Sequence, residues 1–231
     1  MAWIKTNEVL SLIYGPPVAA NAYLTMKTHY KRNLPHIMPP GATVFITFRL
    51  ADSIAVAALQ QLADQQALAI QEALARLTEP AVRAAAVYAI QKAHFARYDA
   101  LLDRAAHGPT WLKDPAIASC VMREITLLKE LDVSVIACCV MSNHVHLLIQ
   151  LPAESSFSAA RMMQRLKGRT ALDVNKLLNR QGQPFWRHES YDHLVRDEKE
   201  QARIVAYILN NPVKAGLVNQ WTEWPYSYYV G

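Results

Sequence analysis

The alternation of hydrophobic and polar residues predicts a protein of mixed strands and helices. Four segments have the short apolar runs, or the β-branched and aromatic residues, that are typical of strands. They are residues 43–49, 133–140, 144–151 and 192–196. Helical patterns occupy residues 114–131, 155–179 and 198–210. Because helices alternate with single strands and one strand pair, we expect an antiparallel sheet with helices on one face, an α+β fold.

An alanine-rich region follows the first predicted strand. Residues 53–107 contain no glycine and few β-branched residues, and they predict two helices that are broken near Thr78 and Pro80. Thr78 suits an N-cap and Pro80 a first helical turn, as Asp114 and Pro115 do at the next helix. The region is therefore interpreted as a helical insertion.

The rest of the chain is organised as one domain. Residues 1–34 have no sustained periodicity and lead into a proline-rich stretch, so we interpret them as an extended N-terminal arm. A chain of 231 residues, 52% of them hydrophobic and 19% charged, can bury a full core, which excludes a wholly disordered protein. We expect a single catalytic domain at residues 35–231, carrying the insertion at about 53–107.

Composition excludes several chemistries and compartments. The seven glycines are too scattered to form a dinucleotide fingerprint or a phosphate-binding loop, so no ATP site is expected. The three cysteines have no disulfide or metal-binding spacing, which fits a reducing compartment. Residues 9–20 only faintly resemble a signal sequence, and no apolar run reaches the ~18 residues of a membrane helix. We expect a soluble cytoplasmic protein with no membrane partner.

Positive charge is concentrated in one predicted helix and the loop after it. Residues 161–187 carry seven basic side chains and one acidic side chain, a net charge of +6, whereas the whole chain carries +5. Such a segment is typical of a protein that binds a polyanion, and equally of a solvated helix face. Phe185 and Trp186 beside these charges can stack on unpaired bases, or they can belong to the core.

Two histidines, His144 and His146, begin the strand predicted at residues 144–151. Strand side chains alternate in direction, so both imidazoles project from the same face and can chelate one divalent ion. Two histidines that serve only the fold would have the same spacing, and several metal hydrolases share it. The pair indicates a candidate metal site without identifying the reaction.

Tyr207 and Asn211 form the second candidate site. They are four residues apart in the last predicted helix, so they lie on one helical face. Pro212 disfavours further helix and so places Asn211 at the helix end, where its amide oxygen can complete the coordination of a hard cation. A phenol, whose pKa is near ~10, needs a polarised phosphate to attack, and a bound metal supplies that polarisation. A tyrosine that only packs in the fold is the alternative.

Together the two motifs resemble a known family. Residues 141–146 (MSNHVH) are similar to the histidine-hydrophobic-histidine signature of single-tyrosine HUH transposases. Residues 207–218 (YILNNPVKAGLV) resemble the tyrosine helix of their REP-associated subgroup, which is linked to repetitive extragenic palindromes. The resemblance runs from about residue 31 to the C-terminus. Further similar segments lie at residues 34–53, 111–115, 185–197 and 223–228.

The resemblance implies a ferredoxin-like core, a Mg²⁺ or Mn²⁺ ion bound by His144, His146 and Asn211, and Tyr207 as the nucleophile. Tyr207 would attack single-stranded DNA beside a palindromic repeat hairpin and form a 5′-phosphotyrosine link, so that strands are nicked and rejoined without ATP. The transposase-like enzyme would act as a monomer or a homodimer. The DNA contacts that we predict are Arg161, Arg165, Lys167, Arg169, Trp186 and Arg187.

Two other functions fit the same residues. One is a protein that binds structured nucleic acid without cleaving it, and the other is a metal hydrolase that cleaves a different substrate without a protein-linked intermediate. The chain also departs from the family, because Ser142 stands where proline is usual and the insertion exceeds a minimal catalytic core. Four other tyrosines are rival nucleophiles: Tyr191, Tyr226, Tyr228 and Tyr229. None of them has a potential metal ligand placed as Asn211 is relative to Tyr207.

Overall fold

The computed structural model describes residues 29–31, 35–37, 39–154 and 158–231. The predicted N-terminal arm lies outside this part of the chain except for residues 29–31. The strands are β1 (His29–Lys31), β2 (Pro35–Ile37), β3 (Thr43–Arg49), β4 (Ser134–Val140), β5 (His144–Gln150), β6 (Tyr191–Leu194) and β7 (Ser227–Tyr229). The helices are α3 (Val56–Arg76), α4 (Pro80–Arg104), α5 (Pro115–Thr126), α6 (Ala159–Leu177) and α7 (Glu198–Lys214). Three 3₁₀ turns lie at Trp111–Lys113, Leu127–Leu131 and Trp221–Glu223.

Five antiparallel strands form the main sheet, in the order β6-β3-β5-β4-β7. The first four follow the β-α-β-β-α-β chain order of a ferredoxin-like fold, with α5 and α6 as the crossover helices. The predicted α+β class and all four predicted strands are confirmed. Strand β7, which pairs with the outer side of β4, has only three residues and was not predicted. A separate two-stranded sheet joins β1 and β2.

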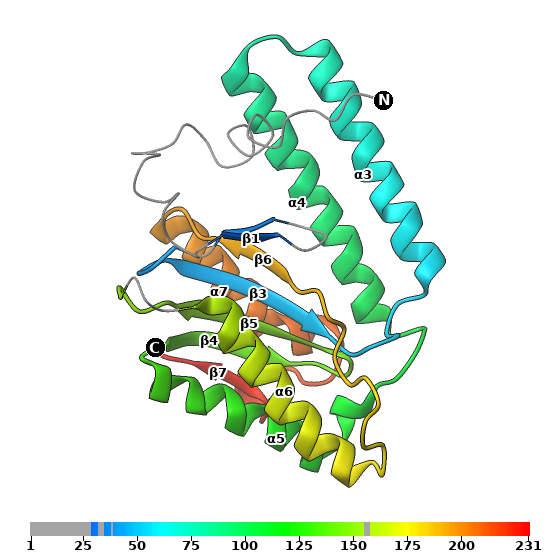
Figure 1. Cartoon of the computed structure of the whole chain (residues 1–231), viewed down its shortest axis with the longest axis vertical. Coiled ribbons are helices and arrows are strands. Elements are labelled where there is room, and N and C mark those ends of the chain that lie inside the picture. The colour runs from blue at the N-terminus through cyan, green and yellow to red at the C-terminus, as the bar shows by residue number, and fades with distance from the viewer. Residues whose placement is uncertain (1–28, 32–34, 38, 155–157) are drawn as a thin grey trace. The chain divides into compact units, whose positions relative to one another are not determined.

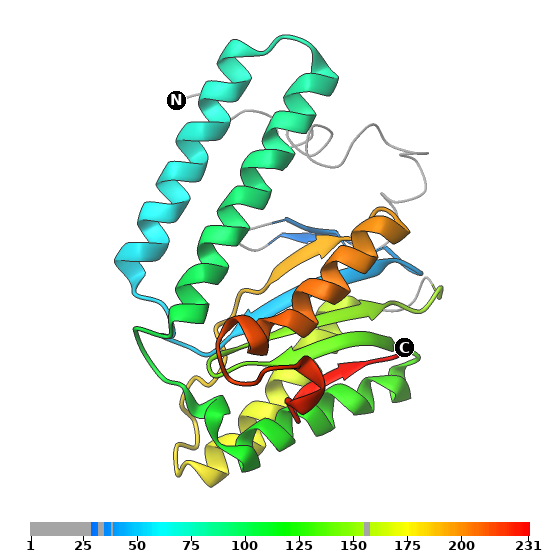
Figure 2. The same cartoon turned by 180° about the vertical axis from the view of Figure 1, so that it is seen from behind.

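The two faces of the main sheet carry different helices. Helices α5 and α6 cover the face on which Val44, Ile46 and Phe48 of β3 join the hydrophobic core (Figure 1). Helix α7 lies against the opposite face, where it packs on β4 and β5 (Figure 2). The helical layer that the sequence predicts on one face of the sheet thus consists of α5 and α6. Helix α7, which carries Tyr207, lies on the other face, where no helix was expected.

Helix α7 corrects the sequence-based expectation about Pro212. The helix was expected to end near residue 210, but it continues to Lys214 with Pro212 inside its last turn. The chain turns only at Gly216, which has φ of +67°, and the Gly216 and Leu217 amides donate to the Val213 and Pro212 carbonyls. These two bonds form a Schellman cap, which satisfies carbonyls of the last turn. The helix therefore continues past Pro212.

Residues 54–107 form a separate compact unit, the helical hairpin. Helices α3 and α4 confirm the two helices predicted here, and they pack against each other. The N-cap of α4 is Glu79 rather than Thr78, because the Glu79 carboxylate accepts from the Val82 amide at 2.8 Å while Pro80 takes the first helical position. Among the described residues, no helix is long and apolar enough to cross a bilayer.

The two chain segments that flank the hairpin both belong to the sheet unit, and they approach each other closely. Gly108 has φ of +72°, and a Cβ there would lie 2.0 Å from the Asp52 carbonyl oxygen. Only glycine allows this approach, because any other side chain would collide with backbone. The chain leaving β3 and the chain returning before α5 are therefore in direct backbone contact.

Candidate functional site

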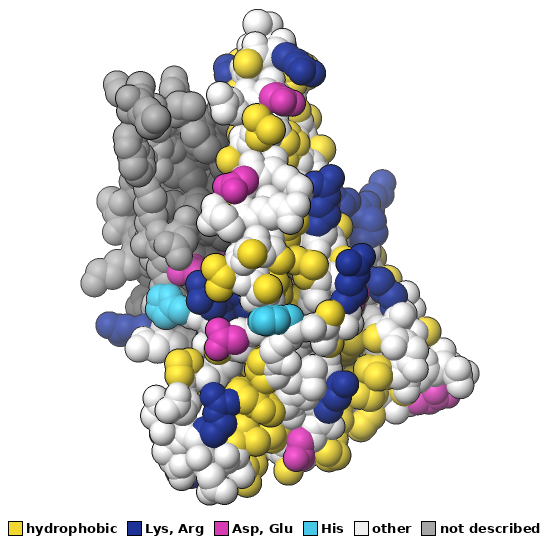
Figure 3. Space-filling view, turned by 90° about the vertical axis from the view of Figure 1, so that its right-hand side faces the viewer, with side chains coloured by type: hydrophobic (Ala, Val, Ile, Leu, Met, Phe, Trp, Pro, Cys, Tyr) yellow, Lys and Arg dark blue, Asp and Glu magenta, His cyan; other side chains and the backbone are white. Residues whose placement is uncertain are grey.

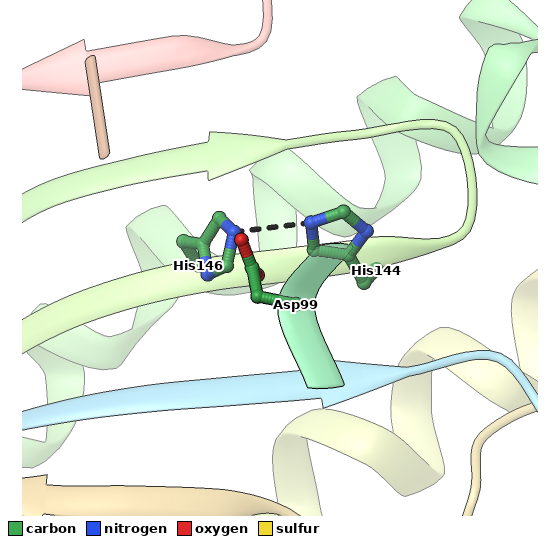
Figure 4. A group of neighbouring side chains, drawn as sticks. All are labelled: Asp99, His144 and His146. Atoms are coloured by element: carbon green, nitrogen blue, oxygen red, sulfur yellow. Dashed lines mark hydrogen bonds between the residues drawn. The ribbon is translucent and has the colours of Figure 1, made fainter. Parts of the chain in front are cut away.

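The candidate site is built around the two histidines of β5. His144 and His146 are paired with Arg49 and Thr47 of β3, and His146 is paired with Cys139 of β4 on the other side. Both imidazoles are buried, and their Nε2 atoms lie 3.0 Å apart (Figure 4). The alternation of the strand thus brings the two nitrogens together as the sequence predicts.

Each imidazole is oriented by a second hydrogen bond. His144 Nδ1 donates to the Asn143 amide oxygen at 2.7 Å, and the Thr47 hydroxyl donates to His146 Nδ1 at 2.8 Å. With these partners, His146 Nε2 donates to His144 Nε2, and all three bonds are satisfied together. Metal-binding histidines are commonly held by such outer partners, which fix the ring orientation and the tautomer.

Burial keeps His146 neutral. Desolvation and, to a smaller degree, the charge of Lys214 lower the pKa of His146 from 6.5 to about 3. A neutral imidazole has a lone pair to offer a cation, whereas a protonated one does not. His146 therefore has the charge state that a metal ligand requires at neutral pH.

Tyr207 of α7 packs directly on His146 of this pair. Its ring centroid lies 5.3 Å from that of His146 and 6.0 Å from that of Phe45, with both rings approached edge to face. The Tyr207 side chain is half-buried. The predicted nucleophile and one predicted metal ligand are therefore in contact within a single chain.

Asn211 lies one helical turn beyond Tyr207 and is 1% exposed. Its Nδ2 donates to the Tyr207 carbonyl at 2.8 Å, which fixes the amide plane. Its Oδ1 is buried and has no hydrogen-bond partner among the described residues. A buried acceptor without a partner costs about 1–3 kcal/mol, and a bound hard cation would remove that cost. The chemistry of Asn211 Oδ1 and of the Nε2 atoms of His144 and His146 thus suits the ligands of a divalent metal.

The N-terminal half of α7 is fastened to β6 by a buried carboxylate. Glu200 Oε1 contacts His193 Nε2 at 3.1 Å, and Glu200 Oε2 accepts from the Arg196 amide at 2.9 Å. Asp197 caps the helix by accepting from the Glu200 amide at 2.7 Å. Because Glu200 and Tyr207 are two turns apart on one face, these contacts also define how Tyr207 meets the sheet.

Of the basic residues predicted to contact DNA, Arg161, Arg165, Lys167 and Arg169 lie on α6, across the sheet from Tyr207. Arg187 lies beyond that helix, and its amide donates to the Arg49 carbonyl at 2.9 Å. Arg161 is exposed. Arg165 forms an ion pair with Glu130 at 3.0 Å, and Arg169 one with Glu124 at 3.8 Å. In the view of Figure 3, basic side chains are interspersed with acidic, hydrophobic and uncharged ones. The predicted residues on α6 therefore do not line the histidine pair.

Lys167 has a different environment from the other basic residues of α6. Its ammonium donates to the Arg187 and His188 carbonyls at 3.0 and 3.1 Å and to the Ser190 hydroxyl at 2.7 Å. Three bonds use all three ammonium protons. Lys167 thus holds the 187–190 segment in place, whereas the Arg187 side chain itself is exposed.

Trp186 corrects the expectation that it stacks on DNA bases. It is 8% exposed, its ring lies 4.8 Å from that of Phe48, and its Nε1 donates to the Thr170 hydroxyl at 2.7 Å. Phe185 is buried beside it. Both aromatics serve the core, because their faces and the indole donor are used inside the protein.

Thr47 and Asn143 have roles that were not predicted. Asn143 directly precedes His144, but its sequence position does not show where its amide points. Thr47 is almost a hundred residues from His146, and the strand register that joins them cannot be read from either segment alone. The alternation of residues 43–49 could have placed Thr47 and Arg49 on one face, but not opposite the histidines.

Comparison with known proteins points to one class for this region. Residues 119–211 match the family model described as "Transposase IS200 like", a segment that includes both histidines, Tyr207 and Asn211. A Haemophilus influenzae protein named "Putative REP-associated tyrosine transposase" is 34% identical over 102 residues, which cover 41% of this chain and 57% of that protein. The Escherichia coli REP-associated tyrosine transposase is 38% identical over 45 residues, which cover 20% of this chain and 27% of that protein.

A solved structure of a REP-associated tyrosine transposase bound to a REP hairpin aligns with a TM-score of 0.46 and 19% identity, over 86% of this chain and 80% of that one. The sequence matches span no more than 57% of either curated relative. Within that span, the family match and the relatives confirm the resemblance to IS200-like and REP-associated tyrosine transposases.

Proposed function

We propose that the protein nicks and rejoins single-stranded DNA at REP-type hairpins, through a covalent link to Tyr207 and with a divalent metal. The observation that carries this proposal is the packing of the Tyr207 ring on His146, whose Nε2 faces that of His144. The match of residues 119–211 to IS200-like transposases supports it, because that segment contains all of these residues.

His144, His146 and Asn211 would hold the metal, Mg²⁺ or Mn²⁺. To present its Nε2 lone pair, His146 must carry its proton on Nδ1, where the Thr47 hydroxyl can accept it instead of donating. The Thr47 contact thus survives either tautomer. The bound ion would polarise the phosphodiester and stabilise charge on the departing oxygen.

The covalent step would exchange one phosphodiester bond for another. The Tyr207 oxygen forms a bond to phosphorus, and the bond from phosphorus to the 3′-oxygen of the neighbouring nucleotide breaks. The phenol proton passes to solvent, and the departing 3′-oxygen takes up a proton. The product is a 5′-phosphotyrosine with a 3′-hydroxyl, so the reverse attack rejoins strands without a nucleotide cofactor.

The names of the relatives support repetitive palindromes as the DNA class. Arg161 and Arg187, which are exposed, and the surface arginines Arg165 and Arg169 would contact phosphates of the hairpin stem. Since α6 is on the opposite sheet face from Tyr207, contacts by its arginines Arg161, Arg165 and Arg169 would position DNA outside the cleavage site. Lys167 and Trp186 are not included, because their polar groups are engaged inside the protein.

The test is formation of a denaturation-resistant adduct. The protein is incubated with Mn²⁺ and a 3′-labelled oligonucleotide that carries a palindromic hairpin and a single-stranded flank, then run on a denaturing gel. We expect an adduct with the natural protein and with Tyr228→Phe, and none with Tyr207→Phe or with chelator. Hairpin binding that ignores chelator, without an adduct, would favour a non-catalytic binding protein. Cleavage without an adduct would favour a hydrolase.

A further inference from the structure

Arg49 lies beside the histidine pair but has no part in the site described so far. It is the last residue of β3 and is paired with His144 of β5. Thr47, two residues earlier, bonds His146, so Arg49 belongs to the same face of the sheet. Directly opposed residues have Cβ atoms about 4.5–5.5 Å apart. The Arg49 side chain thus begins next to the His144 imidazole.

The guanidinium of Arg49 is buried and fastened at one corner. The residue is 3% exposed, and its Nη1 donates to the Leu50 carbonyl at 3.3 Å and to the Ser53 hydroxyl at 3.1 Å. The Ser53 hydroxyl donates in turn to the Leu50 carbonyl at 2.8 Å. These contacts hold the Nη1 corner and thereby fix the plane of the guanidinium.

The rest of the guanidinium is unpaired. Within the described part of the chain, Arg49 Nε is buried without a hydrogen-bond partner, Nη2 has none, and no carboxylate forms an ion pair with this side chain. A buried charge without a counter-charge is strongly unfavourable, and proteins seldom retain one unless a ligand compensates it. The edge formed by Nε and Nη2 is one of the two edges with which arginine binds phosphate bidentately.

We propose that Arg49 binds the phosphodiester of the DNA strand that enters the Tyr207 site, through its Nε–Nη2 edge. This inference rests on the proposed function, since it gives that site a residue that positions the phosphate. A phosphodiester carries one negative charge over two non-bridging oxygens, so it matches both the charge and the spacing of the unpaired edge. Arg49 is a positioning residue, and Tyr207 remains the nucleophile.

The test pairs a protein change with a DNA change and measures binding only. In a Tyr207→Phe background, which prevents turnover, affinity is measured by fluorescence anisotropy for hairpin oligonucleotides with single-stranded flanks. A neutral methylphosphonate replaces one flank phosphate at a time. We expect one position to weaken binding about 10- to 100-fold with Arg49 present and to have no further effect in Arg49→Ala. The proposal would be overturned if Arg49→Ala lowered the affinity for every oligonucleotide, modified or not, by the same factor. It would also be overturned if Arg49→Ala bound unmodified DNA as tightly as the protein with Arg49.

Two further variants separate binding from folding. Ser53→Ala removes a support of Nη1 but keeps the charge and the unpaired edge, so it should keep the position-specific methylphosphonate effect. Arg49→Lys keeps the charge but loses the fork, so it should bind unmodified DNA less tightly and respond less to that methylphosphonate. If Arg49→Ala does not fold, the test uses Arg49→Lys instead. The proposal is then overturned if the methylphosphonate lowers the affinity of Arg49→Lys as much as it lowers the affinity of the protein with Arg49. Failure of the proposed function is recognised separately, as a missing adduct in the protein with Tyr207 intact.

Discussion

Strands β3 and β5 present two very different surfaces with alternate residues of the same segments. Toward α5 and α6 both strands place only apolar side chains: Val44, Ile46, Phe48, Val145, Leu147 and Ile149. Toward α7 they place four polar side chains that are also buried: Thr47, Arg49, His144 and His146. Because the backbone is shared, the two surfaces differ only in the chemistry of their side chains.

The difference separates residues that stabilise the fold from residues that would take part in the proposed chemistry. Burying apolar side chains is favourable, whereas buried polar groups are tolerated only when they are satisfied, and Arg49 and Asn211 keep buried polar atoms without partners within the described residues. A protein optimised only for stability would place apolar residues on both surfaces. We infer that the α7 surface, the polar surface, is retained for ligands, and we expect its variants to lose function more than stability.

The largest effect on stability is expected on the apolar surface. Phe48→Ala removes a fully buried ring and should lower the free energy of unfolding by about 3–5 kcal/mol, measured by urea denaturation. At a temperature where the variant is folded, adduct formation should be unchanged. Loss of the adduct by a folded Phe48→Ala protein would contradict the separation of the two surfaces.

A smaller loss of stability with a large loss of metal binding is expected at Thr47. Thr47→Val removes the hydroxyl that contacts His146 at 2.8 Å and leaves the shape of the side chain nearly unchanged. We expect the free energy of unfolding to fall by about 1 kcal/mol and Mn²⁺ affinity, measured by calorimetry, to fall about 10- to 100-fold. Thr47→Ser keeps the hydroxyl and should retain the affinity. Equal affinities for the valine and serine variants would refute this role.

Asn211 should show little or no cost in stability. Asn211→Leu replaces a buried oxygen that lacks a partner in the described structure, so thermal and urea unfolding should show no change or a gain of up to about 1 kcal/mol. Metal-dependent adduct formation should fall about tenfold or more, because a proposed oxygen ligand is lost. Asn211→Asp retains an oxygen there and should form the adduct. An active leucine variant would remove Asn211 from the site.

The smallest change in stability is expected at Arg161, compared with Lys167. Arg161→Gln should change the free energy of unfolding by no more than about 0.5 kcal/mol. The slope of log K against log salt concentration for hairpin binding should become less steep by about one. Lys167→Gln breaks three internal hydrogen bonds, so it should lower stability and leave the salt dependence unchanged. The reverse pattern would show that Lys167, not Arg161, contacts DNA.

The sequence was sufficient for features that depend on neighbouring residues. Periodicity located β3 and the histidine strand, and the Asp114–Pro115 pair marked the start of α5, because such signals act within a few residues. The common direction of His144 and His146 follows from strand alternation alone. Tyr207 and Asn211 share a helical face for a similarly local reason.

Features that depend on distant residues were not predicted or were predicted wrongly. Trp186 is beside arginines in the sequence, but its partners, Phe48 and Thr170, come from other elements and make it a core residue. Pro212 disfavours helix locally, but the cap at Gly216 extends α7 past it. The roles of Thr47 and Arg49 depend on the register of β3 with β5, which tertiary packing determines.

The most direct test of the central claim is whether a metal at the histidine pair is close to Tyr207. The protein is labelled with fluorotyrosine, and the ¹⁹F resonance of Tyr207, assigned with Tyr207→Phe, is recorded during Mn²⁺ addition beside that of Tyr228 in β7. We expect Mn²⁺ to broaden the Tyr207 resonance first, and this broadening to disappear in the combined His144→Ala and His146→Ala variant. A Tyr207 resonance that Mn²⁺ leaves unchanged, or that broadens equally without the histidines, would contradict the account.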